Sequence, residues 1–160
     1  MYRSWIGWGA FVAICFFAAA IGSWFTAASV TSWYPGLLKP VGTPPDWVFG
    51  PVWSTLYFLM GTAAWLVYRQ RSLANAAPAL ALFFAQLALN VAWSFVFFGL
   101  RQPGWALLDI ISLLAALIAT MTRFAPISRL AAWLLTPYLG WALYATFLNF
   151  GIWSLNRGAQ

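Results

Sequence analysis

The sequence predicts an all-α protein embedded in a membrane as a bundle of five transmembrane helices. Its 160 residues are 64% hydrophobic and only 6% charged, whereas an ordinary soluble domain is about 25% charged. Five apolar stretches are each long enough to cross a hydrocarbon core of about 30 Å as a helix. We therefore expect one domain, residues 1–160, with spans at roughly 5–28, 47–68, 77–99, 105–122 and 130–153.

Charge and reactive side chains argue against several function classes. The net charge of +6 comes from basic residues that stand singly or in pairs between apolar stretches. We interpret them as topology anchors and expect no nucleic-acid-binding patch. The chain has no histidine and a single cysteine, Cys15, so we expect no metal site and no intrachain disulfide. No nucleophile–base pair is visible, and a conventional catalytic site is not expected.

The first span is followed by an aromatic, proline-rich run, residues 33–53. Its prolines fix φ, remove backbone donors and push the preceding residues toward extended geometry. The run is therefore expected to form a semi-rigid lid over a binding site whose walls are the helices. Small residues that permit close helix packing recur late in the first span: Ala18, Ala19, Gly22 and Ser23.

The second span begins between Asp46 and Pro51. Asp46 suits an N-cap or first-turn position, where a carboxylate meets the positive end of the helix dipole. Pro51 marks either a later start or a kink in the first turns. Helical spacing places one stripe of the span on a common face: Trp53, Tyr57, Met60, Gly61 and Ala64.

The third span has two contrasting faces when its residues are placed at about 100° intervals. One face bears Ala77, Ala81, Ala85, Ala88 and Ala92, and the other bears Gln86, Asn90, Trp93 and Phe97. An alanine face lets another backbone approach closely, which favours a homodimer through Ala77, Ala81, Ala85 and Ala88. Amides inside a membrane need a partner or a ligand, so the opposite face is expected to line a cavity.

The last two spans each contain one unusual residue. Asp109 is the only acid within a span and can pair with Arg101 or another basic group at that interface. Pro137 is expected to kink the fifth span. That span also carries a stripe of aromatic, small and amide residues, for which ordinary helix packing is the alternative: Tyr138, Trp141, Ala145, Asn149, Ile152 and Asn156.

The basic residues also predict an orientation. With five spans, the amino terminus shares a side of the membrane with the second-to-third and fourth-to-fifth loops. That side holds Arg3, Arg69, Arg71, Arg123 and Arg129, and the opposite side holds Lys39, Arg101 and Arg157. The positive-inside rule therefore favours a cytoplasmic amino terminus and a lid on the outer side.

Four different short motifs follow one another along the chain. Residues 44–53 read Pro-Pro-Asp-Trp-Val-Phe-Gly-Pro-Val-Trp, and residues 86–94 read Gln-Leu-Ala-Leu-Asn-Val-Ala-Trp-Ser. Gly-Trp-Ala-Leu follows at 104–107 and Pro-Tyr-Leu-Gly-Trp at 137–141. Together they closely resemble the translocator protein / tryptophan-rich sensory protein family (TspO/MBR). The resemblance covers nearly the whole chain and implies five transmembrane helices, a dimer in several members, and a pocket under the first long loop.

The resemblance also implies a set of ligand-binding residues. By motif position, Trp33 and Tyr34 belong to the lid. The pocket residues it implies are Trp53, Asn90, Trp93, Trp141, Ala145 and Leu148. Tyr57 and Phe97 lie on the same helical stripes as these residues and complete the predicted set.

The function that the resemblance implies is ligand binding in a membrane, here expected to be a bacterial one. Family members bind porphyrins, isoquinoline carboxamide and benzodiazepine probes and, in animals, cholesterol. We therefore expect a receptor or sensor for porphyrin-like and other hydrophobic aromatic ligands. A protoporphyrin-type tetrapyrrole is the expected ligand and no cofactor is required. The alternatives are a light-dependent porphyrin-degrading enzyme, with Trp141 as the candidate photochemical residue, and a transporter of porphyrins or sterols.

The chain departs from the family pattern in two places. Gly42 stands where members commonly carry a tryptophan, which is expected to loosen the lid or to open room for a ligand. Phe150, Gly151 and Ser154 occupy the region of the cholesterol pattern of animal members, so cholesterol binding by that route is not expected. Residues 66–71 fit a second, looser cholesterol pattern that carries little weight.

Overall fold

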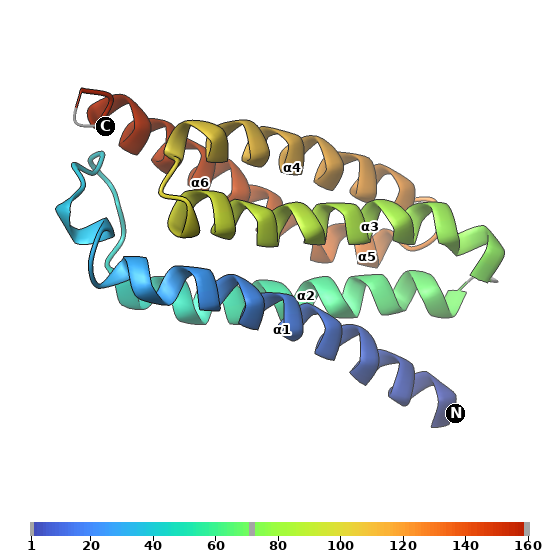
Figure 1. Ribbon diagram of the computed structural model, residues 1–160. Helices are drawn as coiled ribbons and strands as arrows, with labels where there is room; N and C mark the ends of the chain where they lie inside the picture. The colour runs from blue at the N-terminus through green and yellow to red at the C-terminus, as the bar shows by residue number, and fades with distance from the viewer. Residues whose placement is uncertain (1, 71–72, 159–160) are drawn as a thin grey trace.

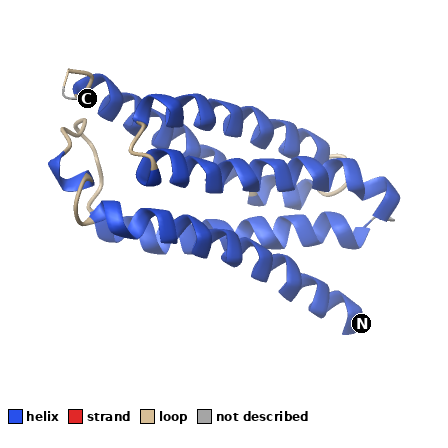
Figure 2. Ribbon diagram, in the orientation of Figure 1, coloured by secondary structure: helices blue, strands red, loops and turns tan. Residues whose placement is uncertain are grey.

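The computed structural model describes residues 2–70 and 73–158, and in these two ranges it contains helices and loops but no strand (Figures 1 and 2). The α-helices are α1 (Tyr2–Val30), α2 (Phe49–Gln70), α3 (Leu73–Ser94), α4 (Pro103–Phe124), α5 (Arg129–Leu134) and α6 (Thr136–Leu155). A π-helical turn, η3 (Phe95–Gly99), extends α3. The predicted all-α bundle is confirmed.

Residues 31–48, here called the lid, connect α1 to α2 at one end of the bundle (Figure 1). Two short 3-10 turns, η1 (Tyr34–Gly36) and η2 (Asp46–Val48), interrupt the lid. Asp46 was expected at the N-cap or in the first turn of the second span; it occupies the first turn of η2, which leads directly into α2. Pro51 falls in the first turn of α2, where its missing N–H costs no helical hydrogen bond.

Three helices within the described residues are long and apolar enough to cross a membrane: Trp5–Val30, Asn75–Gly99 and Pro103–Phe124. α2 and α6 have 22 and 20 residues but direct tyrosine, tryptophan and amide side chains into the interior. The assignment of α2 and α6 as spans stays a prediction, as does the orientation, for which Arg71 lies outside the described residues.

Pro137 interrupts the fifth predicted span, as expected. α5 ends at Leu134 and α6 begins at Thr136, because proline has no N–H to continue the helical ladder. The Leu135 N–H donates instead to the carbonyl of Ala132 at 3.2 Å. The fifth span is thus a short helix followed by a long one.

α1 and α2 come into close contact at Gly61. A Cβ at this position would lie 2.7 Å from the Cα of Val12, so only glycine permits this approach of the two backbones. The predicted stripe of α2 faces the interior here: Tyr57 is 5% exposed, and Met60 and Ala64 are fully buried. The indole N–H of Trp8 donates to Thr62 Oγ1 at 3.1 Å near this crossing.

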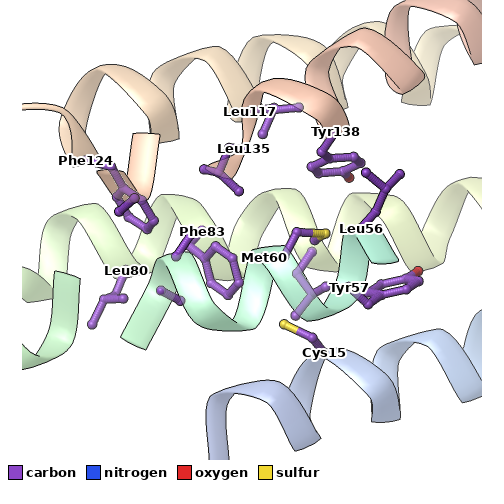
Figure 3. Packing of buried hydrophobic residues seen from close by; sticks show 14 of the residues in the cluster. Cys15, Leu56, Tyr57, Met60, Leu80, Phe83, Leu117, Phe124, Leu135 and Tyr138 are labelled. Atoms are coloured by element: carbon purple, nitrogen blue, oxygen red, sulfur yellow. The ribbon is translucent and has the colours of Figure 1, made fainter. Parts of the chain in front are cut away.

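Side chains from all six α-helices form the apolar core. Figure 3 shows Cys15 of α1, Met60 of α2, Phe83 of α3 and Leu117 of α4 converging. The buried face of α4 repeats every three and four residues, as a helix packed on one side should: Pro103, Ala106, Ile110, Leu113, Leu117, Thr120 and Phe124. Asp109 lies beside this face, and its Oδ2 is buried without a hydrogen-bond partner among the described residues. The expected pairing with Arg101 is therefore not made at that oxygen.

Gln86 departs from the expectation for its stripe. Its side chain is fully buried, but it is not among the residues that line the cavity described below. It lies on α3 one turn further from the lid than Asn90. Within the described chain, neither its amide nitrogen nor its amide oxygen has a hydrogen-bond partner.

Replacing Gln86 by methionine, which has a similar length, is expected to raise the melting temperature of the detergent-solubilised protein. A buried polar group without a partner costs about 1–3 kcal/mol, and methionine removes that cost while filling a similar volume. Leu87→Met, at a buried position of the same helix, is the control and should leave the melting temperature nearly unchanged. A clear decrease for Gln86→Met alone would contradict the prediction.

Candidate ligand-binding cavity

A cavity of about 670 Å³ lies between α1, α2, α3 and α6, next to the lid. This volume falls within the range of about 300–1,000 Å³ that is usual for small-molecule sites. Trp53 of α2, Trp93 of α3 and Trp141 of α6 all contribute to its wall. The lid contributes Tyr34, which is 6% exposed. The cavity is therefore mainly apolar and aromatic.

The structure brings together all of the predicted ligand-binding residues except Trp33. Those that line the cavity are Tyr34, Trp53, Tyr57, Asn90, Trp93, Phe97, Trp141, Ala145 and Leu148. Trp33 is not among the lining residues, and its ring packs against Phe97 with the ring centroids 5.9 Å apart. Trp33 thus supports a wall residue, and ligand contact by the other residues stays a prediction.

Sequence reasoning missed the contribution of α1. Phe16, Ala20, Ser23 and Ala27 line the cavity and are spaced by four, three and four residues, which places them on one helical face. The pattern was present in the sequence, but small residues at this spacing are equally typical of helix–helix packing. Asn149 also lines the cavity, on the α6 stripe for which ordinary packing was the alternative.

Asn90 connects three helices at the wall of the cavity. Its Oδ1 accepts a hydrogen bond from the Tyr57 hydroxyl of α2 at 2.5 Å. Its Nδ2 donates to the Tyr138 hydroxyl of α6 at 2.9 Å. An amide inside a membrane needs such partners, and here it finds them in the protein. The bonds hold α2, α3 and α6 in one register around the cavity.

A second amide orients one of the cavity tryptophans. The indole N–H of Trp93 donates to Asn149 Oδ1 at 2.9 Å, and Asn149 Nδ2 donates to the carbonyl of Pro103 at 2.8 Å. The Trp93 ring also stacks on Phe97, with the ring centroids 5.0 Å apart. In contrast, the indole nitrogen of Trp141 is buried without a hydrogen-bond partner among the described residues. The Trp141 ring thus lines the cavity, while its N–H is left without a protein partner.

Two contacts with α6 hold the middle of the lid in place. Asn156 forms a pair of hydrogen bonds with the backbone of Leu38: its Oδ1 accepts from the Leu38 N–H at 3.1 Å, and its Nδ2 donates to the Leu38 carbonyl at 2.9 Å. Pro40 packs against Gly151, where an added Cβ would lie 2.6 Å from the proline Cγ. Glycine is required at this position because a side chain would displace the lid.

A third contact involves Gly42, the position where family members commonly carry tryptophan. Gly42 has φ +93°, a left-handed conformation that favours glycine. The Tyr144 hydroxyl of α6 donates a hydrogen bond to its carbonyl oxygen. Gly42 is not among the residues that line the cavity. The glycine therefore adds no room to the cavity, and its backbone is held against α6.

One carboxylate and one ammonium group lie near the lid end of the cavity. Asp46 is the one charged residue among the described lining residues. The Lys39 ammonium lies over the Tyr34 ring, 4.5 Å from its centroid, as a cation–π contact. Burial, followed by the nearby charge of Asp46, raises the pKa of Tyr34 above its ordinary value. The Tyr34 hydroxyl therefore stays neutral and can donate a hydrogen bond at physiological pH.

The fold and the cavity first define the class: a helical membrane protein with an internal cavity of ligand size. The model of the TspO/MBR family matches residues 11–154 of the chain. This range contains every described residue that lines the cavity, and the entire lid. The chain belongs to the TspO/MBR family.

Relatives from three kinds of organism support this assignment. The chain is 48% identical over 135 residues to the tryptophan-rich protein TspO of Archaeoglobus fulgidus, covering 84% of this chain and 87% of that protein. It is 45% identical over 140 residues to the human translocator protein, covering 86% and 83%. It is 41% identical over 143 residues to the tryptophan-rich sensory protein of Cereibacter sphaeroides, covering 88% and 89%.

Replacing Asn156 by leucine is expected to release the lid from α6. The substitution removes both hydrogen bonds to Leu38, each worth about 0.5–1.5 kcal/mol, so the lid should open more often and be cleaved faster by a soluble protease. Asn75→Leu, at an exposed position of α3, is the control and should not change the cleavage rate. Equal cleavage of the Asn156 variant and the unmodified protein would show that these bonds do not hold the lid.

Proposed function

We propose that this protein is a membrane receptor that binds porphyrin-like and other hydrophobic aromatic ligands in the cavity beside the lid. The observation that carries the proposal is that three tryptophans from three helices, Trp53, Trp93 and Trp141, line one cavity of ligand size. Flat ring systems stack on indole faces, and burial of their large apolar area supplies most of the affinity. The names of two relatives, a sensory protein and a translocator protein, support a receptor or sensor role.

The polar groups of the cavity suit a ligand with a hydrogen-bond acceptor and without a metal. Trp141 offers a free indole N–H, and Tyr34 offers a neutral hydroxyl. The described lining residues include no cysteine or methionine, and the chain has no histidine. Of the axial ligands that haem iron takes, only tyrosine stands among these residues, in Tyr34 and Tyr57. Lys39 belongs to the lid, and its ammonium, which lies over the ring of the lining residue Tyr34, can meet ligand carboxylates. These features favour a metal-free tetrapyrrole over haem.

Titration of the purified protein with protoporphyrin in darkness is expected to quench tryptophan fluorescence until the site is saturated. Trp53→Phe and Trp141→Phe should each reduce both the quenching and the affinity, because each removes part of the aromatic wall and the second also removes the free donor. Trp105→Phe is the control, since Trp105 lies on α4 and is 67% exposed. Quenching that never saturates, or that is equally reduced by all three substitutions, would contradict the proposal.

We also propose that the protein forms a homodimer through the alanine face of α3. The four predicted interface residues are exposed on the outer surface of the bundle: Ala77, Ala81, Ala85 and Ala88. Such a face permits close contact between two helix backbones, and in a membrane this contact itself supplies the attraction.

The double substitution Ala81→Leu with Ala85→Leu is expected to disrupt this dimer, because two larger side chains separate the helices. The measurement is chemical cross-linking in liposomes, followed by comparison of monomer and dimer bands. Ala115→Leu, at an exposed position of α4, serves as the control. An undiminished dimer band in the double variant would rule out this interface.

A further inference from the structure

Near the lid, α1 and α2 pack against different elements of the bundle. Close to the middle of the bundle they touch at Gly61 and Val12. Nearer the lid, α1 lies against α3 and η3: the Ser29 hydroxyl donates to the Phe98 carbonyl at 2.6 Å, and the rings of Phe25 and Phe95 are 4.9 Å apart.

α2 lies against α6 over the same part of the bundle. The rings of Phe49 and Trp141 are 5.8 Å apart, and those of Trp53 and Tyr138 are 6.2 Å apart. The cavity occupies the space between these two pairs of helices. The ring contacts between α1 and α2 involve Trp5, Trp8 and Phe11 of α1, so among the described residues none of them lies beside the cavity.

The exposure of the lining residues shows where the cavity reaches the outside. Every exposed lining residue lies on α1, on η2 or at the start of α2: Phe16, Ala20, Ser23, Ala27, Asp46, Gly50 and Ser54. The lining residues of α3, η3 and α6 are all buried or half-buried. The cavity thus opens between α1 and α2, at a boundary that we call the side opening, defined by Ala20 and Ser23 of α1 and Gly50 and Ser54 of α2.

Two of the hydroxyls at the side opening and behind it are satisfied within their own helices. The Ser54 hydroxyl donates to the Gly50 carbonyl of its own helix at 2.9 Å, and the Thr26 hydroxyl behind the opening donates to the Gly22 carbonyl at 2.9 Å. Hydroxyls that are satisfied within their own helix need no water. The side chains here are also small, so they leave a passage. This surface suits hydrocarbon better than an aqueous solution.

The α1 edge of the side opening lies within a helix that can span a bilayer, whereas the lid covers one end of the bundle (Figure 1). Residues 16–27 belong to the stretch of α1 that is long and apolar enough to span a bilayer, Trp5–Val30. The lid is held to α6 at Leu38, Pro40 and Gly42. A ligand that entered past the middle of the lid would have to break these contacts, and a ligand that entered beside Ala20 would not.

We infer that ligands enter and leave the cavity sideways from the bilayer, through the side opening between α1 and α2, and that the lid is not their route. The inference rests on the proposed function and narrows its ligand class to molecules that partition into the bilayer. A flat aromatic ring system can pass between two helices edge-on. A ligand that does not partition into the bilayer has no comparable path.

The test fills the side opening and follows the rate of binding. In the Ala20→Phe, Ser54→Phe double variant in nanodiscs, protoporphyrin delivered from phosphatidylcholine vesicles should associate and dissociate about tenfold more slowly, a change that lies within the range seen among variants of one site. The dissociation constant should change much less than either rate, because both rates cross the same obstacle. Porphyrin fluorescence reports the binding, and the melting temperature of each variant confirms folding.

The control variants distinguish the two routes. Ala115→Phe with Ser112→Phe makes the same substitutions on the exposed face of α4, where the Ser112 hydroxyl likewise donates within its helix, to the Leu108 carbonyl at 3.0 Å; binding rates should not change. Asn156→Leu, which loosens the lid, should not accelerate association. Association at the unmodified rate in the filled variant, or clear acceleration by Asn156→Leu, would overturn the inference.

A second probe separates this inference from the proposed function. Phosphatidylcholine with brominated acyl chains quenches tryptophans that the chains can reach, and it requires no porphyrin binding. Filling the side opening should reduce this quenching relative to the α4 control pair, because acyl chains then lose access to Trp53 and Trp141. If the unmodified protein does not bind protoporphyrin, the proposed function fails. In that case the quenching measurement alone still tests the side opening, and quenching that filling leaves unchanged would contradict it.

Discussion

A bilayer interior offers no water to hydrogen-bond a buried amide, and this constraint organises the wall of the cavity. Asn90 satisfies it by accepting from Tyr57 and donating to Tyr138, which ties α2, α3 and α6 together. Asn149 does the same between Trp93 and the backbone of Pro103. Because these side chains find protein partners, the rings beside them are held in fixed positions around a space that remains apolar.

α1 takes no part in this amide network, and its packing follows a different rule. Glycine sets its distance from α2 at Gly61, and Gly22 lies close to Ser94 of α3. Contacts of this kind hold a helix by shape, and α1 hydrogen-bonds to its neighbours through Trp8 and Ser29, neither of which lines the cavity. The cavity is therefore rigid on the α3 and α6 sides and bounded on the α1 side by small side chains. The lid, in contrast, is held by an amide side chain, because Asn156 hydrogen-bonds to its backbone.

The sequence placed cavity residues more accurately in the helices than in the lid. Trp53, Asn90, Trp93 and Trp141 lie on helical stripes, where spacing fixes which side chains share a face, and all four line the cavity. Trp33 was assigned to the same site, but it lies in the lid, where no periodicity constrains the direction of a side chain, and it packs behind Phe97. Gln86 shares the stripe of Asn90 and yet lies in the core, because the cavity ends within one turn of the helix.

Composition and periodicity were sufficient to define the helices, their apolar nature, the bend at Pro137 and the irregular lid, since each follows from the local chemistry of neighbouring residues. Which helices come together, and where they separate, depends on contacts between residues far apart in the chain. The pairing of Asn156 with Leu38, the approach of Gly61 to Val12 and the opening beside Ala20 are of this kind. Small residues permit both close packing and open space, and only the three-dimensional arrangement of the neighbouring helices distinguishes the two.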